Sequence, residues 1–318
     1  MSNRPATFLI TAAGTGTAWG YALALAQQFP HVRLITADTN EQPWCTAAQL
    51  ASTHVRWPLF QAGPAYLQQL QALVEAEGVT HYLPIIDPEI HFAAEHRHQI
   101  NATVLAPHAG FTALALAKDR YADALAAWEI DSPRTLTVDA AAARLARGQR
   151  VFAKQPGSFG GRGTWEVAEP SMLCTLPAGA FLQEGLAGPE FTADCFPLGG
   201  GNVFVSVRER METKSGVCTK ARIAPHAGME ALAQALVRAT GVETPFCFQA
   251  MADGDRLAVT DINPRLGAGT AMSAANGSDF HGAHLAQQLG DAQWQQRLQR
   301  HHARCAVTRQ YFEMLSPL

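Results

Sequence analysis

The stretch that decides the fold is Phe152-Ala-Lys-Gln-Pro-Gly-Ser-Phe-Gly-Gly-Arg-Gly163. The apolar run Val151–Lys154 predicts a strand that delivers a lysine directly into a glycine-rich loop. Glycine lets backbone N–H groups approach phosphate oxygens closely, and Lys154 adds a fixed positive charge. The loop is not a Walker A loop, because it lacks the Gly-Lys-Ser/Thr ending and no helix follows at once. The segment predicts a phosphate-binding loop, and an ordinary hairpin loop is the alternative.

A second polar segment, Asp261-Ile-Asn-Pro-Arg265, ends the predicted strand Leu257–Ile262. Alternate residues of a strand face the same side, so Asp261 and Asn263 project together. Their oxygen atoms are hard ligands that suit Mg²⁺. The planar fork of Arg265 can bind a phosphate or a carboxylate. Taken alone, the segment could also be a turn with a cap.

A third segment, Gln183-Glu-Gly-Leu-Ala-Gly-Pro-Glu190, joins the predicted strands Phe181–Glu184 and Phe191–Phe196. A flat base could lie against such a connection and form hydrogen bonds with its exposed backbone. Glu190 would then accept hydrogen bonds from ribose hydroxyls. The segment says little about chemistry by itself. The order of the three segments within about one domain length is the more specific signal.

The first hundred residues show strand, glycine turn, helix and strand in succession, which predicts a βαβ opening and a small parallel α/β unit. The predicted strands are Thr7–Ala12, Val32–Ala37, Thr80–Ile86 and Thr103–Ala106, and the predicted helices are Trp19–Gln28 and Tyr66–Glu77.

The pattern changes after residue 108, where helices around 110–127 and 139–147 are followed by many short strands. Asp253-Gly254 is a good hairpin signal between two of these strands. Besides the strands named above, the sequence predicts strands at Trp165–Val167, Asn202–Arg210 and Phe246–Met251, and helices at Met229–Thr240, Ala283–Leu289 and Trp294–Arg300.

The composition is that of a globular protein that buries a core. Of 318 residues, 47% are hydrophobic and 16% charged, and the formal net charge is −3. This charge favours neither nucleic acid nor an anionic membrane as a partner. The six cysteines form no C-x-x-C pair, which argues against a zinc knuckle or a disulfide framework. No apolar run approaches a membrane span, and the first one ends in a glycine turn. We therefore expect a soluble, cytoplasmic protein.

These segments, in this order, resemble the ATP-grasp superfamily, and most closely the branch similar to the large subunit of carbamoyl phosphate synthetase. The resemblance covers nearly the whole chain. It implies a parallel α/β pre-ATP-grasp domain at 1–108, followed by a two-lobed α+β ATP-grasp domain at 109–318 with a glycine-rich lid and C-terminal helices. It also implies an ATP-dependent carboxylate–amine ligase that uses Mg²⁺ (or Mn²⁺), forms an acyl phosphate and releases ADP and phosphate. Its partners would be small-molecule carboxylates and amines, and a homodimer is common for such folds.

The resemblance implies a set of site residues. Arg265 and Lys154 would be catalytic. The metal ligands would be Gln249, Asp261 and Asn263, and the nucleotide would be bound by Lys118, Lys154, Gly160, Gly161, Arg162, Gly163, Glu184, Leu186, Glu190 and Arg210. Two departures stand out. The family usually has glutamate where this chain has Asp261, whose shorter side chain still binds Mg²⁺ but is less suited to bridging two metal ions. The chain also lacks the second synthetase half and a glutaminase domain, which counts against carbamoyl phosphate synthesis.

A rival interpretation comes from Gly14-x-Gly16-x-x-x-Gly20, which ends near Asp38 and resembles a dinucleotide fingerprint. It would make the protein an NAD-dependent oxidoreductase or a nucleotide-binding sensor, although the third glycine comes one residue late.

A third class is a non-catalytic ATP-grasp module, against which the intact lysines, Asn263 and Arg265 argue. The substrate pair is set by pocket shape, which one sequence does not reveal; amino acids are the default expectation.

Overall fold

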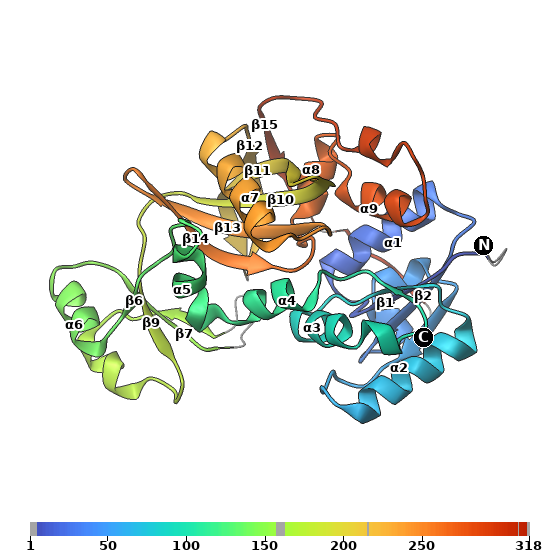
Figure 1. Ribbon diagram of the computed structural model, residues 1–318, viewed down its shortest axis with the longest axis horizontal. Helices are drawn as coiled ribbons and strands as arrows, with labels where there is room; N and C mark the ends of the chain where they lie inside the picture. Colours follow the sequence, from blue (N-terminus) through green and yellow to red (C-terminus); the bar gives the residue numbers. More distant parts are fainter. Residues whose placement is uncertain (1–4, 157–162, 215, 311, 317–318) are drawn as a thin grey trace.

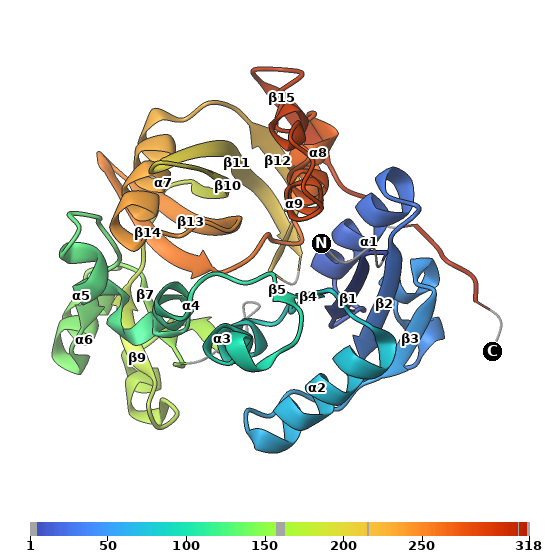
Figure 2. The ribbon, with the colours of Figure 1, turned by 45° about the vertical axis from the view of Figure 1, so that its right-hand side comes forward.

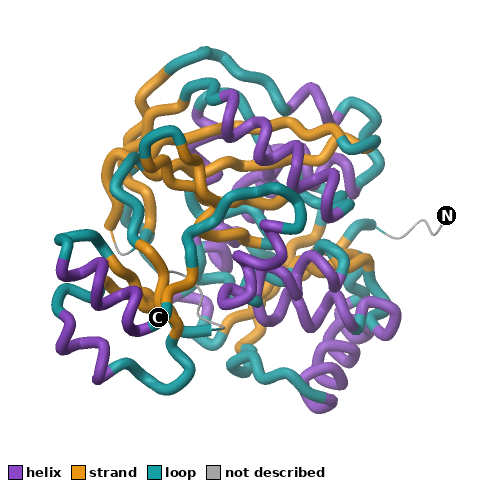
Figure 3. Tube along the Cα trace, turned by 60° about the vertical axis from the view of Figure 1, so that its left-hand side comes forward, coloured by secondary structure: helices purple, strands orange, loops and turns teal. Residues whose placement is uncertain are grey.

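A computed structural model describes residues 5–156, 163–214, 216–310 and 312–316, and three sheets organise them (Figure 1). The fold is mixed α/β, with a parallel N-terminal sheet and two antiparallel sheets after it, as the sequence predicts. In Figure 3, helices pack over the strands in each of these parts. No helix within the described ranges is both long enough and apolar enough to cross a membrane.

The N-terminal sheet has the strand order β3-β2-β1-β4-β5, and all its pairs are parallel. Every residue of β1 is buried, as expected for a strand covered on both faces. The helix α3 and the edge strand β3 were not predicted from the sequence. The elements are β1 (Thr7–Thr11), α1 (Gly16–Gln28), β2 (Arg33–Asp38), β3 (Thr53–Arg56), α2 (Pro64–Glu77), β4 (His81–Leu83), α3 (Asp87–Glu95) and β5 (Thr103–Val104).

The small second sheet has the strand order β6-β9-β7-β8 and packs against α6. Two short helices, α4 and α5, connect the N-terminal sheet to it. The sequence predicted one longer helix around 110–127, but the 3₁₀ turn η4 (Lys118–Arg120) divides it. In Figure 2 this sheet lies at one end of the molecule. The elements are α4 (Ala109–Leu116), α5 (Tyr121–Ala126), β6 (Thr135–Leu136), α6 (Val138–Ala146), β7 (Val151–Lys154), β8 (Thr164–Glu166) and β9 (Phe181–Glu184).

The third sheet is antiparallel, with the strand order β14-β13-β10-β11-β12-β15, and α7 covers one of its faces. The predicted hairpin is confirmed, because Asp253 pairs with Arg256 and Gly254 has a left-handed φ of 61°. Strands β12 and β15 were not predicted. The elements are β10 (Glu190–Gly199), β11 (Asn202–Lys214), β12 (Val217–Ile223), α7 (Ala227–Thr240), β13 (Phe246–Asp253), β14 (Arg256–Asn263) and β15 (Cys305–Thr308).

The C-terminal helices return to the N-terminal part of the chain. Helix α9 (Phe280–Gln288) lies against α1, while α8 (Thr270–Ala275) follows the end of β14 (Figure 2). A β-carbon added to Gly20 of α1 would lie 2.6 Å from His281, so α1 and α9 approach closely only because residue 20 is glycine. The predicted helix Trp294–Arg300 is wrong in extent, because only a 3₁₀ turn at Trp294–Arg297 forms.

Candidate active site

The polar face of the third sheet is the one that α7 does not cover. Gln249 of β13 pairs directly with Asp261 of β14, and Cys247 pairs with Asn263. Phe248 and Ala250, which alternate with these residues on β13, belong to the core packed under α7. Because alternate residues share a face, the three predicted metal ligands lie together on the opposite face.

Asp261 is the centre of a charged cluster on this face. Its Oδ1 lies 2.8 Å from Lys118 Nζ, and its Oδ2 accepts a hydrogen bond of 3.2 Å from Asn263 Nδ2. Lys154 reaches the same strand, where its Nζ donates to the carbonyl of Thr260 at 3.4 Å. Burial lowers the pKa of Lys154, and Asp261 partly opposes this effect. The structure therefore brings both predicted lysines to the predicted metal ligands.

The donor set of this cluster is suited to a metal ion that arrives with a nucleotide. It holds one carboxylate and two amides, and among the described residues no group of three or more His, Cys, Asp or Glu is placed to hold a metal. Asp261 Oδ1 is buried, and within the described part of the chain it accepts no hydrogen bond, although Lys118 pairs with it. Mg²⁺ is commonly bound by one or two carboxylates together with substrate phosphates. Gln249, Asp261 and Asn263 fit that role.

Glu190 and Arg210 form a pair at the start of β10. Arg210 Nη1 lies 2.9 Å from Glu190 Oε1, and its Nη2 donates to the carbonyl of Gly216 at 2.8 Å. Burial raises the pKa of Glu190, while Arg210 opposes the rise. Arg210 therefore orients the acid predicted to bind ribose. Two of its nitrogens are bonded to the protein, while its buried Nε has no hydrogen-bond partner in the described structure.

The side chain of Glu184, one of the predicted nucleotide-binding residues, is directed at α6 and at the start of β14. Its Oε1 accepts hydrogen bonds from the backbone of Arg134 at 3.1 Å and from Arg256 at 3.0 Å, and its Oε2 lies 3.5 Å from Arg144 of α6. A role of this side chain in holding adenine is therefore not supported. The connection between β9 and β10 still offers a backbone donor to a ligand. In the described part of the chain, the N–H of Leu186 has no hydrogen-bond acceptor.

Gln183 is a residue that the sequence analysis missed. Gln183 pairs with Phe152 of β7. Phe152 and Lys154 flank Ala153, whose side chain belongs to the core under α6. Alternation thus places Gln183 and Lys154 on the same face of the small sheet, opposite α6. The Gln183 side chain is buried, and its Oε1 has no hydrogen-bond donor in the described structure. Side chains alternate between the two faces of β9, so Gln183 and Glu184 lie on opposite faces. This alternation was the signal that could have identified Gln183.

Arg265 is fixed by the N-terminal part of the chain. Its Nε donates to the carbonyl of Ile85 at 2.9 Å and lies 3.1 Å from Oδ1 of Asp87, while its Nη1 donates to the carbonyl of Leu266 at 3.3 Å. Asp87 opens α3 and was not predicted as a site residue. Burial raises the pKa of Asp87, and Arg265 opposes the rise.

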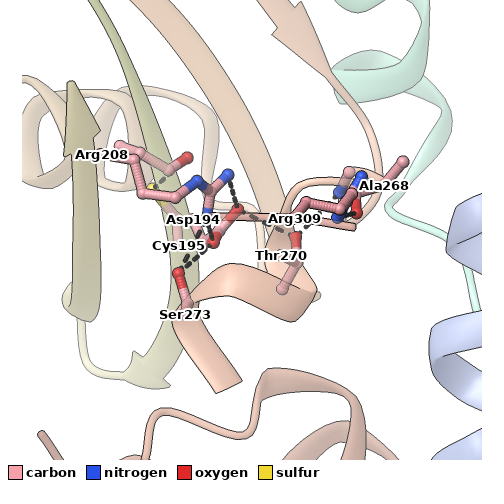
Figure 4. Close-up of polar contacts among 9 residues, drawn as sticks. Asp194, Cys195, Arg208, Ala268, Thr270, Ser273 and Arg309 are labelled. Atoms are coloured by element: carbon pink, nitrogen blue, oxygen red, sulfur yellow. Dashed lines mark hydrogen bonds and ion pairs between the residues drawn. The ribbon is translucent and has the colours of Figure 1, made fainter. Parts of the chain in front are cut away.

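The loop that follows Arg265 is held by a buried polar network (Figure 4). Asp194 of β10 pairs with Arg208 and accepts hydrogen bonds from Thr270 at 2.9 Å and Ser273 at 2.7 Å. Arg309, near the C-terminus, donates to the carbonyl of Ala268. The loop is therefore fixed to the third sheet and to the C-terminal strand region.

Residues 178–310 match the model of a family described as "ATP-grasp in the biosynthetic pathway with Ter operon". The whole arrangement also matches solved structures. The L-amino acid ligase from Bacillus licheniformis is 14% identical with a TM-score of 0.70, covering 94% of this chain and 78% of its own. The chain has the ATP-grasp fold.

Other structures agree with this assignment of the ATP-grasp fold. The biotin carboxylase domain of Hydrogenobacter thermophilus 2-oxoglutarate carboxylase, solved with MgADP, ADP and bicarbonate, is 13% identical with a TM-score of 0.68, covering 89% of this chain and 70% of that one. N5-carboxyaminoimidazole synthetase from Staphylococcus aureus, complexed with ADP, is 13% identical with a TM-score of 0.68, covering 90% and 78%. No curated protein sequence matches the chain significantly.

The N-terminal glycine turn is occupied by hydrogen bonds and packing within the chain itself. The N–H of Gly14 donates to Asp38 at 2.9 Å. Burial raises the pKa of Asp38, but hydrogen bonds from Asn40 and Gly14 outweigh it and lower the pKa overall. A β-carbon on Gly16 would lie 3.1 Å from that of Ala268. The glycines thus serve close packing, and the geometry gives the NAD alternative no support.

The glycine-rich loop is described only in part. Gly160, Gly161 and Arg162 lie outside the described residues. Gly163 is described: its carbonyl accepts from the N–H of Gln155 at 2.8 Å, and its φ is +71°. Lys154 pairs with Thr164, so antiparallel strands flank the loop.

Proposed function

We propose that the chain is an ATP-dependent carboxylate–amine ligase that forms an acyl phosphate and releases ADP and phosphate. The observation that carries this proposal is the convergence of Lys118, Lys154 and Arg265 around Asp261 at the end of β14. The ATP-grasp fold and the family match support it. The solved relatives include a ligase and a synthetase by name, which favours bond formation over simple nucleotide binding.

The proposed chemistry needs charge neutralisation more than a protein nucleophile. A carboxylate is a poor electrophile, and phosphorylation by ATP gives it a good leaving group. Such a transfer depends on positioning and on electrostatic stabilisation. Lys118 and Lys154 would neutralise the phosphate oxygens. Mg²⁺ (or Mn²⁺), held by Asp261, Asn263 and Gln249 together with the nucleotide, would supply Lewis-acid neutralisation of the same oxygens.

Arg265 would donate to the oxygen atoms whose negative charge grows in the transition state. A planar guanidinium in a buried setting stabilises such charge strongly, because little solvent screens it. The glycine loop, with the undescribed residues Gly160, Gly161 and Arg162, would exclude water from the acyl phosphate.

The nucleotide would lie between the small sheet and the third sheet. We propose that its base is bound by the backbone of Leu186 and that its ribose is bound by Glu190. Lys154 and Gln183 share the face of the small sheet that would border it. The branch similar to carbamoyl phosphate synthetase, the division at residue 108 and a homodimer remain proposals from the sequence.

An isotope experiment tests the proposed function. Pools of carboxylates and amines are screened for ATP-dependent phosphate release, and the active donor is then prepared with ¹⁸O in its carboxylate. We expect the label in inorganic phosphate and ADP as the other product. Pyrophosphate release with labelled AMP would refute the acyl-phosphate route. In a parallel calorimetric titration, tighter binding of a nicotinamide dinucleotide than of MgATP would refute the nucleotide assignment.

A further inference from the structure

Asp87 is a buried acid that reaches the candidate site from the N-terminal sheet. It follows β4 and is the first residue of α3, and only 7% of its side chain is exposed. Arg265, its ion-pair partner, follows strand β14 of the third sheet. Lys118 and Asp261 are close enough to influence the pKa of Asp87. The side chain therefore lies beside the proposed site of phosphoryl transfer.

The contacts of Asp87 are incomplete for a buried carboxylate. Its Oδ1 is buried and lies 3.1 Å from Arg265 Nε, but the contact does not have hydrogen-bond geometry, because Nε donates instead to Ile85. Buried polar atoms are nearly always hydrogen-bonded, and exceptions in native structures often mark function. A purely structural ion pair would normally saturate both partners.

Arg265 is held at two of its three guanidinium nitrogens. Nε is directed at Ile85 and Asp87, and Nη1 at Leu266. Within the described part of the chain, Nη2 has no hydrogen-bond partner. Because the guanidinium is planar and rigid, fixing Nε and Nη1 also fixes the direction of Nη2. That nitrogen is the one left to donate to a substrate oxygen.

We propose that Asp87 is a positioning residue that sets the plane of the Arg265 guanidinium, so that the N-terminal unit completes the active site. This proposal rests on the proposed ligase function. Asp87 acts through Arg265 and does not itself touch the reacting atoms. Its place in the first turn of α3 also favours an acid through the helix dipole, so the test must separate the two roles.

A kinetic cycle separates positioning from helix stabilisation. We expect Asp87→Ala to lower kcat by about 10- to 100-fold with the KM for ATP unchanged within about twofold, because only transition-state contacts are lost. The double variant Asp87→Ala/Arg265→Ala should be no slower than Arg265→Ala alone. Losses that multiply in the double variant would overturn the proposal. Asp139→Asn is the matched control, since Asp139 is an exposed acid in the first turn of α6; it should leave kcat unchanged.

A second measurement needs no substrate and so stands apart from the ligase proposal. The Nε–H resonance of Arg265, assigned by its loss in Arg265→Lys, should be protected from solvent exchange in the wild type. Asp87→Ala should shift it and speed its exchange by at least about tenfold, whereas Asp139→Asn should do neither. An unchanged resonance in folded Asp87→Ala would overturn the positioning role, whatever reaction the protein catalyses.

Discussion

Two arginine–aspartate pairs differ in how completely they are bonded: Arg208 and Asp194 are both buried, whereas the side chain of Arg265, beside the buried Asp87, is 21% exposed. Asp194 contacts Arg208 through both oxygens and accepts from Thr270 and Ser273 as well. Among the described residues, Asp87 has a single ion-pair contact, with Arg265. A buried charge that is fully hydrogen-bonded has no capacity left for a ligand.

The difference separates a structural pair from a functional one. Asp194 and Arg208 fasten the loop that carries Arg265, whereas Asp87 and Arg265 keep unused bonding capacity beside the charged cluster. The same contrast divides two acids that the sequence analysis singled out. Asp38 accepts three hydrogen bonds at 2.9 to 3.0 Å, from Gly14 and Asn40, while Asp261 Oδ1 accepts none from the described residues. The glycine turn and the candidate site therefore differ less in residue type than in how many hydrogen bonds their carboxylates accept from the protein.

The largest expected effect comes from breaking the saturated pair. Arg208→Ala leaves Asp194 charged, buried and without its main partner, which typically costs about 3–5 kcal/mol. We expect that loss in the free energy of unfolding measured in urea. Asp194→Asn, which keeps the shape, should cost less. A loss below about 1 kcal/mol for Arg208→Ala would show that saturation does not mark a structural role.

Arg265→Ala tests the second pair of the comparison, Asp87 and Arg265. We expect turnover to fall by about 10²- to 10³-fold, as for removal of an electrostatic donor to the transition state, with little change in ATP affinity. Its stability loss should be smaller than that of Arg208→Ala, because Asp87, whose pKa burial already raises, can take up a proton. Steady-state kinetics and urea unfolding together check this. Normal turnover would exclude Arg265 from the chemistry.

Two histidines between α1 and α9 challenge the rule that unsatisfied atoms mark a site. His281 and His284 are buried, and Nε2 of each lacks a hydrogen-bond partner in the described structure. Burial lowers the pKa of His281 to about 4 and that of His284 to about 3. They lie against Tyr21, whose hydroxyl is 2.8 Å from His284 Nδ1.

These histidines should make the fold sensitive to acid. Their folded pKa values lie below the unfolded value of about 6.5, so the unfolded state binds more protons below that pH. Stability is then fully present above about pH 6.5 and falls by about 2 kcal/mol per histidine at pH 5. His284→Gln, which can still bond to Tyr21, should flatten the decline seen in urea unfolding at pH 7.5, 6 and 5. An unchanged slope would mean that these groups do not titrate on unfolding.

The smallest effect is expected from Lys154→Met. Loss of one partly buried positive charge should weaken MgATP binding by about tenfold while the fold persists. Lys220→Met is the matched control, since Lys220 forms an exposed ion pair with Glu212 on the third sheet. Calorimetric titration distinguishes the two, and equal affinities for both variants would remove Lys154 from the nucleotide site.

The sequence predicts those parts of the fold that have strong periodicity. Strands such as Thr7–Thr11 and helices such as Pro64–Glu77 follow from apolar spacing, and the hairpin at Asp253-Gly254 follows from turn chemistry. Strand β12 was missed because Lys220 and Arg222 are exposed and interrupt the apolar pattern. Strand β3 is a short, partly exposed edge. Helix α3 is hard to predict because it begins with Asp87-Pro88, directly after the predicted strand Thr80–Ile86, where proline also indicates a turn.

The sequence predicts site residues that lie within one hairpin better than those that meet across the chain. Gln249 and Asp261 share a hairpin, so their meeting follows from strand pairing. Asp87 meets Arg265 only through the packing of two distant elements, which no local pattern reveals. Glu184 was chosen over Gln183 by resemblance, although alternation along β9 turns the glutamate toward Arg144 and α6.

The close contacts of Gly16 with Ala268 and of Gly20 with His281 bear on how this protein could be recombined with others. A chimaera that takes residues 1–108 from a relative would inherit one half of each contact and not the other. A side chain larger than hydrogen at position 16 or 20 would then force α1 away from the C-terminal helices. Arg265 would lose its partners Ile85 and Asp87 in the same exchange, unless the relative supplies equivalents. Functional chimaeras should therefore require the segment 264–284 to be transferred together with the N-terminal residues.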